Sequence, residues 1–240
     1  KIVGVSLTGS EAAGAVVASI AGKNVKPSVL ELGGSDPMIV LNDADIEKVM
    51  SGTINGRVRN AGQACTSSKR IIVQEGIYDE YLKKITDYVN GMKVGDPTQA
   101  DTNMGPVSSE SALEKLVEQI NDSADKGATI VSGGKRIDRD GFFLQPTILT
   151  DLKPGMKAYD EEVFGPVVCI WKVKDIEEAI KIANDTPYGL GASIYTEDVP
   201  NAEKIARRID SGMVYVNKQV SSSPDLPFGG VKHSGYGREL

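Results

Sequence analysis

The chain opens with Ile2-Val3-Gly4-Val5-Ser6-Leu7-Thr8-Gly9-Ser10, a short apolar run that ends in a turn. The next segment, Glu11–Ala21, is rich in Ala and Val and is typical of a helix. The order is therefore strand, tight turn and helix. Gly9 lets the backbone approach a ligand closely, and Ser10 can cap a helix whose free N–H groups attract phosphate. A plain capped turn remains the alternative, because the stretch matches neither the GxGxxG fingerprint nor a P-loop.

Working outward, the same alternation of strands and helices continues to the end of the chain. Further strands are predicted at 25–32, 38–41, 70–74, 129–132, 142–150, 167–173, 191–196 and 213–216. Further helices are predicted from 43 or 45 to about 57, then at 77–90, 109–126, 176–184 and 200–209, with another starting at 238. This alternation predicts an α/β fold with a largely parallel sheet.

Composition excludes several classes of protein. Of the 240 residues, 40% are hydrophobic and 25% charged, which is ordinary for a globular protein. A net charge of −6 argues against a nucleic-acid or anionic-membrane partner, and no apolar run approaches a membrane span. Two distant cysteines, Cys65 and Cys169, indicate a reducing compartment, and we expect the cytoplasm. With a single histidine, His233, they cannot supply the usual zinc ligands, so we expect no metal site.

One cysteine has the surroundings of a nucleophile. Cys65 lies in Asn60-Ala61-Gly62-Gln63-Ala64-Cys65-Thr66-Ser67-Ser68, where small neighbours leave room for a ligand to reach the sulfur. A thiolate is the strongest nucleophile among side chains near neutral pH, provided that its environment lowers its pKa. Burial as a small hydrophobe is the commoner fate of a free cysteine, and composition alone leaves that alternative open. Cys169 lies inside an apolar predicted strand and is interpreted as core.

A carboxylate also stands in an unusual place. Glu31-Leu32-Gly33-Gly34 ends the second predicted strand, so Glu31 lies within an apolar run that is followed by two glycines. Glutamate is rarely buried without a partner or a function, and burial raises its pKa towards the value a general base needs. The alternative is an edge-strand glutamate that faces water.

Five short stretches together resemble the aldehyde dehydrogenase superfamily. In chain order they are Leu7–Ser10, Glu31–Gly34, Gly62–Cys65, Glu162–Pro166 and Pro227–Gly230. The resemblance covers the whole chain, and residues 226–240 are most similar to the succinate-semialdehyde dehydrogenase branch. It implies that residues 1–33 are the last βαβ unit of a Rossmann-like cofactor domain. Residues 34–233 would then form the catalytic α/β domain, and residues 234–240 would begin the return to the cofactor domain. We expect the N-terminal half and the C-terminal tail of such an enzyme to be absent.

The resemblance implies oxidation of an aldehyde, such as succinate semialdehyde, to its carboxylate with NAD or NADP. The Cys65 thiolate would attack the aldehyde, and the thiohemiacetal would lose a hydride to leave a thioester. Glu31 would activate the water that hydrolyses this thioester, and the Cys65 N–H would bind the oxyanion. The resemblance assigns cofactor binding to Gly9, Ser10, Leu32, Glu162 and Phe164, and places Phe228 at the aldehyde pocket.

Three other functions stay open. An acylating enzyme would pass the thioester to coenzyme A, although the presence of Glu31 argues against this. A cysteine hydrolase would need a base beside the thiol, and only His233 is available. A non-catalytic relative, or an inactive fragment of an enzyme, is the third. Pocket shape departs from the family at Val58, where an aromatic residue is frequent, so the wall beside Cys65 would be looser.

Two further expectations concern the substrate and the assembly. A substrate with a carboxylate would favour a cation near the pocket, for which the candidates are Arg59, Lys69 and Lys232. We expect a small-molecule aldehyde as substrate and a parent protein that is a homodimer or homotetramer.

Overall fold

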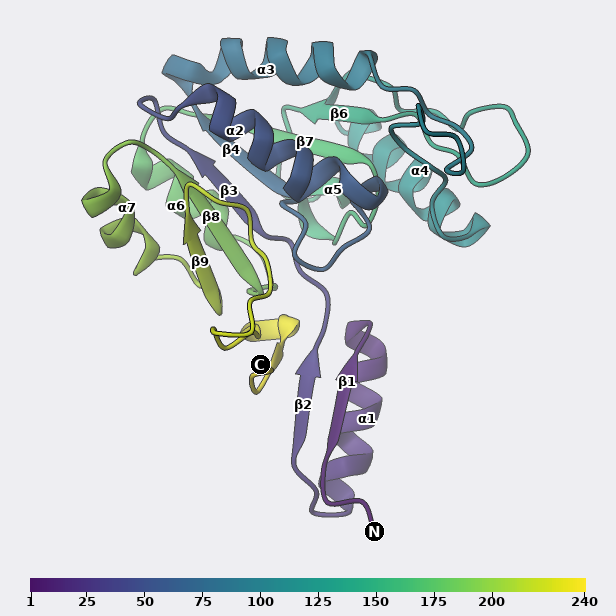
Figure 1. Cartoon of the computed structure of the whole chain (residues 1–240), viewed down its shortest axis with the longest axis vertical. Helices are drawn as coiled ribbons and strands as arrows, with labels where there is room; N and C mark the ends of the chain where they lie inside the picture. Colours follow the sequence, from purple (N-terminus) through teal and green to yellow (C-terminus); the bar gives the residue numbers. More distant parts are fainter.

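The computed structural model describes residues 1–240, and two β-sheets organise them (Figure 1). The smaller sheet has three strands in the order β1-β2-β10, and the larger sheet has seven in the order β5-β6-β7-β4-β3-β8-β9. Figure 1 shows the small unit below the large one, with the chain running from β2 directly up into β3. The Glu31–Gly34 stretch lies at this junction, so the junction is the place to look for a shared site.

The small sheet begins with a parallel βαβ unit. Its elements are β1 (Val5–Thr8), α1 (Glu11–Lys23), β2 (Ser28–Glu31) and β10 (Gly235–Tyr236). The Ser10 hydroxyl caps α1 by accepting a hydrogen bond from the Ala13 N–H at 3.3 Å. The strand β10 pairs antiparallel with the second edge of β2. Glu31 is therefore enclosed on both sides, because its register partners are Thr8 on β1 and Gly235 on β10.

The large sheet is parallel except at one edge. Its strands are β3 (Pro37–Val40), β4 (Arg70–Gln74), β5 (Thr129–Ser132), β6 (Thr147–Thr150), β7 (Val167–Val173), β8 (Gly191–Tyr195) and β9 (Met213–Val216). Only β5 and β6 are antiparallel neighbours. The central strands are covered on both faces and consist of continuous apolar runs, as parallel strands require. The prediction of an α/β fold with a largely parallel sheet is confirmed.

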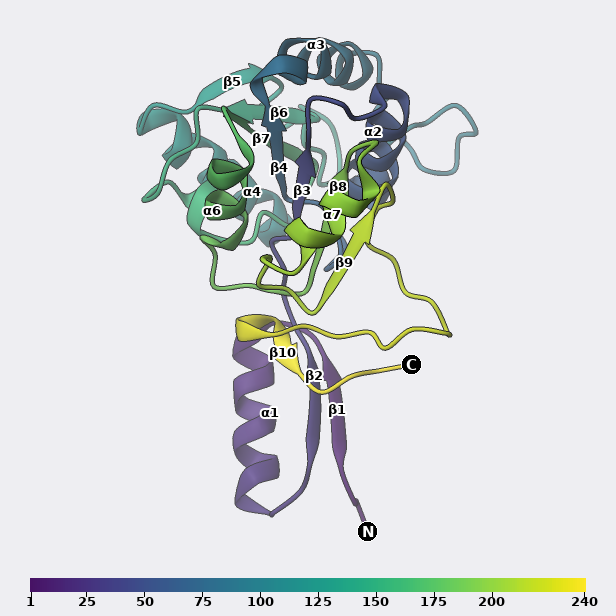
Figure 2. The ribbon, with the colours of Figure 1, turned by 90° about the vertical axis from the view of Figure 1, so that its left-hand side faces the viewer.

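Helices cover both faces of this sheet. They are α2 (Ile46–Thr53), α3 (Glu75–Asn90), α4 (Glu110–Asp125), α5 (Lys157–Asp160), α6 (Ile176–Asn184) and α7 (Val199–Ala206). Successive strand residues face opposite ways, so Ile71 packs with α2 and α3, whereas Ile72 packs with α4, α6 and α7. Figure 2 shows α2 and α6 on opposite sides of the strands. Cys169, on β7, is fully buried in the apolar cluster that contains Ile72, as predicted.

Several predicted helix bounds differ from the structure, and two of the differences are the largest. The helix capped by Asp45 ends at Thr53, and a π-helical turn (Ile54–Val58) and a 3₁₀ turn (Arg59–Gly62) follow it. The predicted helix start at residue 238 is wrong. Glu239 instead forms an antiparallel bridge with Phe228, with N–H···O distances of 2.7 and 2.8 Å. The bridge pairs the backbone groups of Glu239 with those of Phe228, and this pairing takes the place of the expected helix.

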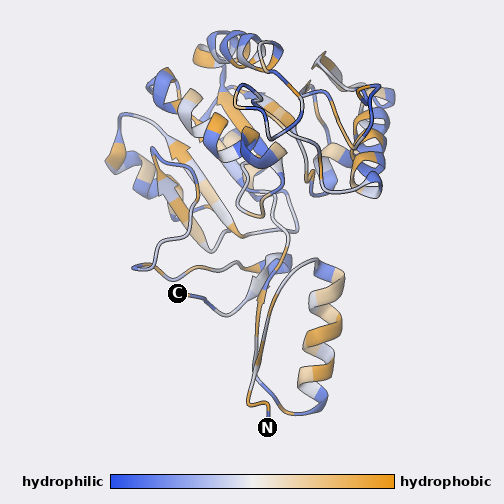
Figure 3. Cartoon of the chain, turned by 45° about the vertical axis from the view of Figure 1, so that its right-hand side comes forward, coloured by the Kyte–Doolittle hydropathy of each residue, from blue (hydrophilic) through white to orange (hydrophobic).

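The small unit differs from the large one in its exposed apolar surface. Figure 3 shows a hydrophobic stripe along α1, and Val16 and Ile20 on this helix are 59% and 57% exposed. Across the whole structure, no helix combines the length and the apolar character needed to cross a membrane.

Candidate active site

The loop that carries Cys65 has an unusual backbone. Asn60, Ala61 and Gly62 have φ angles of 55°, 51° and 69°, a left-handed run within the 3₁₀ turn Arg59–Gly62. Such angles cost of order 1–3 kcal/mol in residues other than glycine and occur mainly where surrounding structure imposes them. A Cβ atom on Gly62 would lie 2.1 Å from the Gly165 carbonyl oxygen, so only glycine fits. The loop is therefore turned sharply and pressed against the 162–166 segment.

Cys65 is partly exposed on this loop, and its backbone N–H donates to no acceptor within the chain. That N–H is therefore available to an oxyanion. The pKa of the thiol is raised, mainly by burial, with smaller contributions from the charges of Asp36 and Glu31. Lys69 and the Thr66 N–H act in the opposite direction. The condition that the environment lowers this pKa is thus not met in the structure as it stands.

Glu31 is buried, with 3% of its surface exposed. Burial is the largest cause that raises its pKa to about 7, and Glu239 adds to it, while the Gly230 N–H and Arg238 oppose it. Its Oε2 has no hydrogen-bond partner in the chain. The alternative of a solvent-facing glutamate is wrong, because β10 closes the open edge of β2. A buried carboxyl with a pKa near neutrality and a free oxygen has the properties of a general base.

Glu162 connects the two halves of the site. Its Oε1 accepts a hydrogen bond from the Gly34 N–H at 3.1 Å and lies 3.0 Å from the Lys69 Nζ. Its Oε2 has no partner, and a Cβ on Gly33 would lie 2.5 Å from it. The absence of a side chain on Gly33 therefore leaves room for this close approach. The free Oε2 is an acceptor for a ligand hydroxyl.

The remaining predicted cofactor residues line the βαβ unit. The Gly9 N–H donates a hydrogen bond to the Glu31 carbonyl at 2.9 Å, and the next residue, Ser10, caps the N-terminus of α1. The Leu32 N–H donates to Ser234, but the Leu32 carbonyl accepts no hydrogen bond from the chain and is free for a ligand amide. These groups fit a dinucleotide: a helix N-terminus for phosphate, a carboxylate for ribose and a carbonyl for an amide.

Two predicted aromatic positions differ in their surroundings. Phe164 is 41% exposed, and the Lys69 Nζ lies 5.5 Å from the centre of its ring, beside Glu162. Phe228 is half-buried and bridges Glu239. The next residue, Gly229, contacts the catalytic candidate, because a Cβ there would lie 3.1 Å from the Glu31 Oε1. Phe228 is thus close in sequence to the site, and its role in an aldehyde pocket stays a prediction.

Sequence reasoning missed one buried charge near the site, Asp36, and misjudged another, Lys69. Asp36 is 1% exposed and accepts a hydrogen bond from the Gly191 N–H at 3.0 Å, and burial raises its pKa to about 7. Lys69 was a candidate for a substrate cation, but it is 2% exposed and bonded to protein atoms. The only signal in the sequence was an acid placed shortly after the two glycines and a lysine shortly after the cysteine.

The histidine lies away from the thiol. The His233 Nδ1 is 2.9 Å from the Glu11 Oε1 at the start of α1, and the ring is largely exposed. No hydrogen bond links it to Cys65, so the base that a cysteine hydrolase needs is not beside the sulfur.

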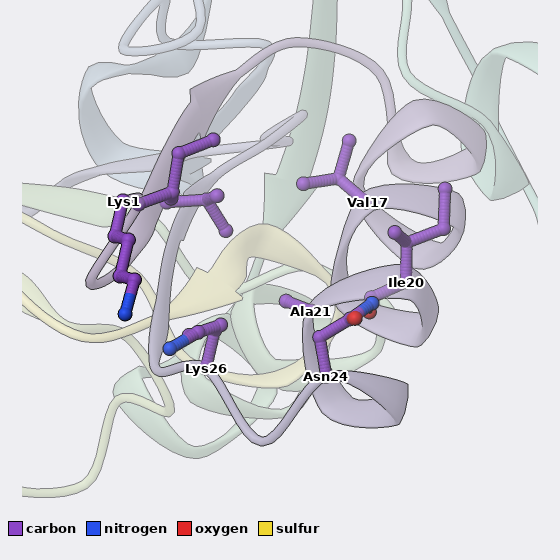
Figure 4. A pocket seen from close by; sticks show the side chains of 8 residues that line it. Lys1, Val17, Ile20, Ala21, Asn24 and Lys26 are labelled. Atoms are coloured by element: carbon purple, nitrogen blue, oxygen red, sulfur yellow. The ribbon is translucent and has the colours of Figure 1, made fainter.

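One cavity of about 490 Å³ lies on the small unit, between the start of the chain and α1 (Figure 4). Val17, Ile20 and Ala21 form its apolar wall, and Lys1 and Lys26 stand at its rim. None of the predicted site residues lines it.

Comparison with known proteins identifies the family. The model of the aldehyde dehydrogenase family matches residues 1–240. The chain is 49% identical over 237 residues to a succinate-semialdehyde dehydrogenase [NADP(+)] of Deinococcus radiodurans, covering 99% of this chain and 50% of that protein.

Solved structures agree with this match. The succinic semialdehyde dehydrogenase of Streptococcus pyogenes, in complex with NADP+, has a TM-score of 0.96 and 47% identity, covering 99% of this chain and 52% of that one. The betaine aldehyde dehydrogenase of Staphylococcus aureus, in complex with NAD+, has a TM-score of 0.95 and 39% identity, covering 100% and 48%. The chain thus spans about half the length of the relatives it matches. With its whole length matched by the family model and its fold shared with these enzymes, the chain belongs to the aldehyde dehydrogenase family.

Proposed function

We propose that the protein containing this chain oxidises an aldehyde to a carboxylate with a nicotinamide cofactor, using Cys65 as nucleophile and Glu31 as general base. The observation that carries the proposal is the contact between the Glu31–Gly34 stretch and the Cys65 loop. A Cβ on Gly34 would lie 2.8 Å from the Cys65 carbonyl oxygen, so the two stretches touch through their backbones. The proposed base also acts on the proposed nucleophile, since the charge of Glu31 contributes to the raised pKa of Cys65.

The cofactor would lie across the junction of the two units. The free Oε2 of Glu162 would accept a hydrogen bond from ribose, and the Leu32 carbonyl would accept one from the carboxamide. Gly9, Ser10 and the start of α1 would face a phosphate, and Phe164 would pack beside the ring. When bound, the nicotinamide ring supplies the hydride acceptor. NADP is favoured because the succinate-semialdehyde dehydrogenases that the chain matches are named for it or solved with it, and an NAD-bound relative keeps NAD open.

The side chains would act in two stages. In the first, the Cys65 thiol loses its proton to solvent, the resulting thiolate attacks the aldehyde carbon, and the free Cys65 N–H binds the oxyanion. Loss of a hydride from that carbon leaves a thioester on Cys65. In the second, Glu31 takes a proton from water, the hydroxide attacks the thioester, and the carboxylate product leaves. The pKa of about 7 lets Glu31 accept a proton and release it again near neutral pH.

Succinate semialdehyde is the substrate we propose, from the names of the relatives. Its carboxylate needs a cation, and two of the three candidates are already engaged. Lys69 is buried, and Lys232 donates to the Asn184 and Thr186 carbonyls and lies near Asp210. Arg59 is exposed, belongs to the turn that leads to Cys65, and makes no ion pair. We therefore assign the substrate carboxylate to Arg59.

The organisation of the whole protein is part of the same proposal. The boundaries at residues 33 and 234 would separate cofactor and catalytic domains, because β10 returns to the small sheet there. We propose a homodimer or homotetramer in the cytoplasm.

The first test compares the two cysteines in the natural full-length protein. Cys65→Ala is expected to abolish NADPH formation from succinate semialdehyde, and the matched control Cys169→Ala, in the core, is expected to keep it. Turnover that survives Cys65→Ala would refute the proposal. Product analysis with added coenzyme A tests the second stage. An acyl-coenzyme A product would mean that the thioester is transferred to coenzyme A and is not hydrolysed.

A further inference from the structure

Lys69 is a buried ammonium group at the centre of the site. It stands just before β4, is 2% exposed, and donates to the Ala64 carbonyl at 2.9 Å and to the Cys65 carbonyl at 3.0 Å. Its third contact is the Glu162 Oε1, at 3.0 Å. An ammonium group has three N–H donors, and a neutral amine has only two. The three acceptors therefore match the charged form.

The surroundings compensate for the burial of this charge. Burial lowers the pKa of Lys69, and the Glu162 and Asp36 carboxylates oppose that shift. The Nζ also lies over the aromatic ring of Phe164, 5.5 Å from the centre of the ring, in a cation–π contact. A buried charge is costly unless it is paired and hydrogen-bonded, and here both conditions are met. The chain thus maintains a charge at a position where a neutral side chain would be cheaper to bury.

The Lys69 ammonium group joins two defined parts of the site. On one side it holds the two carbonyl groups that flank the Cys65 peptide, and on the other it holds one oxygen of Glu162. With Oε1 fixed by Lys69 and the Gly34 N–H, the second oxygen, Oε2, is left free above Gly33. Rotation of the Glu162 side chain would break both of these contacts.

We propose that Lys69 is a positioning residue that couples the nucleophile loop to the cofactor-binding carboxylate. It would orient Glu162 so that one oxygen faces the ribose, and it would hold the Cys65 peptide against the same group. The inference rests on the proposed function, because it takes Glu162 as a cofactor ligand. Lys69 itself touches neither cofactor nor substrate, since all of its donors are used.

The test is a double-mutant cycle in the natural full-length protein, with Lys69→Met, Glu162→Gln and the double variant. The readouts are the Kd for NADPH, followed by nicotinamide fluorescence, and KM for NADP+ against kcat. We expect each single variant to raise Kd about tenfold, equal to about 1.4 kcal/mol. If Lys69 acts through Glu162, the double variant stays near tenfold, whereas independent effects would multiply to about a hundredfold. Lys83→Met, which removes an exposed lysine on α3, is the matched control and is expected to leave Kd unchanged.

The outcomes separate the two proposals. An unchanged Kd in Glu162→Gln would refute Glu162 as a cofactor ligand, and with it part of the proposed function. Two outcomes would refute the coupling alone, provided that Glu162→Gln raises Kd. In the first, Lys69→Met leaves Kd unchanged or lowers it, and in the second, the effects of the two substitutions multiply in the double variant. If Lys69→Met does not fold because the buried Asp36 carboxylate loses the nearby positive charge, Asp36→Asn/Lys69→Met replaces it, with Asp36→Asn as its reference.

Discussion

Replacement of Glu31 by Gln is expected to stop the proposed reaction after the first stage. Gln has nearly the same volume, so the buried position, 3% exposed, should keep its packing. It cannot accept a proton from water, and loss of a general base typically slows a step by about 10²–10⁴-fold. Acylation does not need this proton transfer. The thioester on Cys65 should therefore form and accumulate.

The same carboxyl sets the expected pH dependence. Only ionised Glu31 is a base, and its pKa is raised to about 7, mainly by burial. About one-tenth of the groups would be ionised at about pH 6 and about nine-tenths at about pH 8, so hydrolysis in the wild type should rise roughly ninefold between them. In Glu31→Gln this dependence should disappear.

Rapid mixing of enzyme, NADP+ and aldehyde measures both effects. The variant should show a burst of about one NADPH per Cys65 followed by very slow turnover, and the intact mass should increase by one acyl group. Glu177→Gln, at an exposed glutamate paired with Arg208, is the control and should behave as wild type. Steady-state turnover at the wild-type rate in Glu31→Gln would contradict the role of Glu31. The same conclusion would follow if the rate of hydrolysis rose with pH around the same midpoint in both proteins.

Three further predictions concern the loop, the buried acid and the substrate. Gly62→Ala, with its φ of 69° and a Cβ 2.1 Å from a carbonyl oxygen, should lower unfolding free energy by more than about 1 kcal/mol in urea titrations. Gly22→Ala in α1, where a Cβ meets nothing within 4 Å, should not lower it. The folded pKa of Asp36, about 7, exceeds its unfolded value, so its contribution to stability is full below about pH 4 and is lost as the pH rises towards 7. Asp36→Asn should flatten that decline, seen as a smaller fall in urea midpoint between these pH values; an equal fall in both proteins would contradict the shift. Arg59→Met should raise KM for succinate semialdehyde by about tenfold or more and leave KM for an uncharged aldehyde of similar length unchanged. Equal changes in KM for both aldehydes would argue against a contact between Arg59 and the substrate carboxylate.

Much of the fold could be predicted because its elements are locally encoded. The bounds predicted for β4, β5, β7, β9 and α6 agree with the structure, since each is an apolar run or an amphipathic repeat bounded by polar or turn residues. Prediction failed at residue 238, where a strand pairing with Phe228 replaced a helix. That pairing depends on where a distant loop lies, which local propensity does not contain.

For the site, the sequence by itself determined which groups can do chemistry. Cys65 among small residues, Glu31 before two glycines and the motif around Glu162 were all visible as residue types at particular places. Only the tertiary structure decided their charge states and contacts. Glu162 accepts a hydrogen bond from Gly34, 128 positions away in the sequence, and Lys69, a candidate for the substrate cation, is buried against the same carboxylate. The physical reason is that pKa and burial depend on the dielectric and on partners in space, and those are set when the two sheets meet, not by neighbours along the chain.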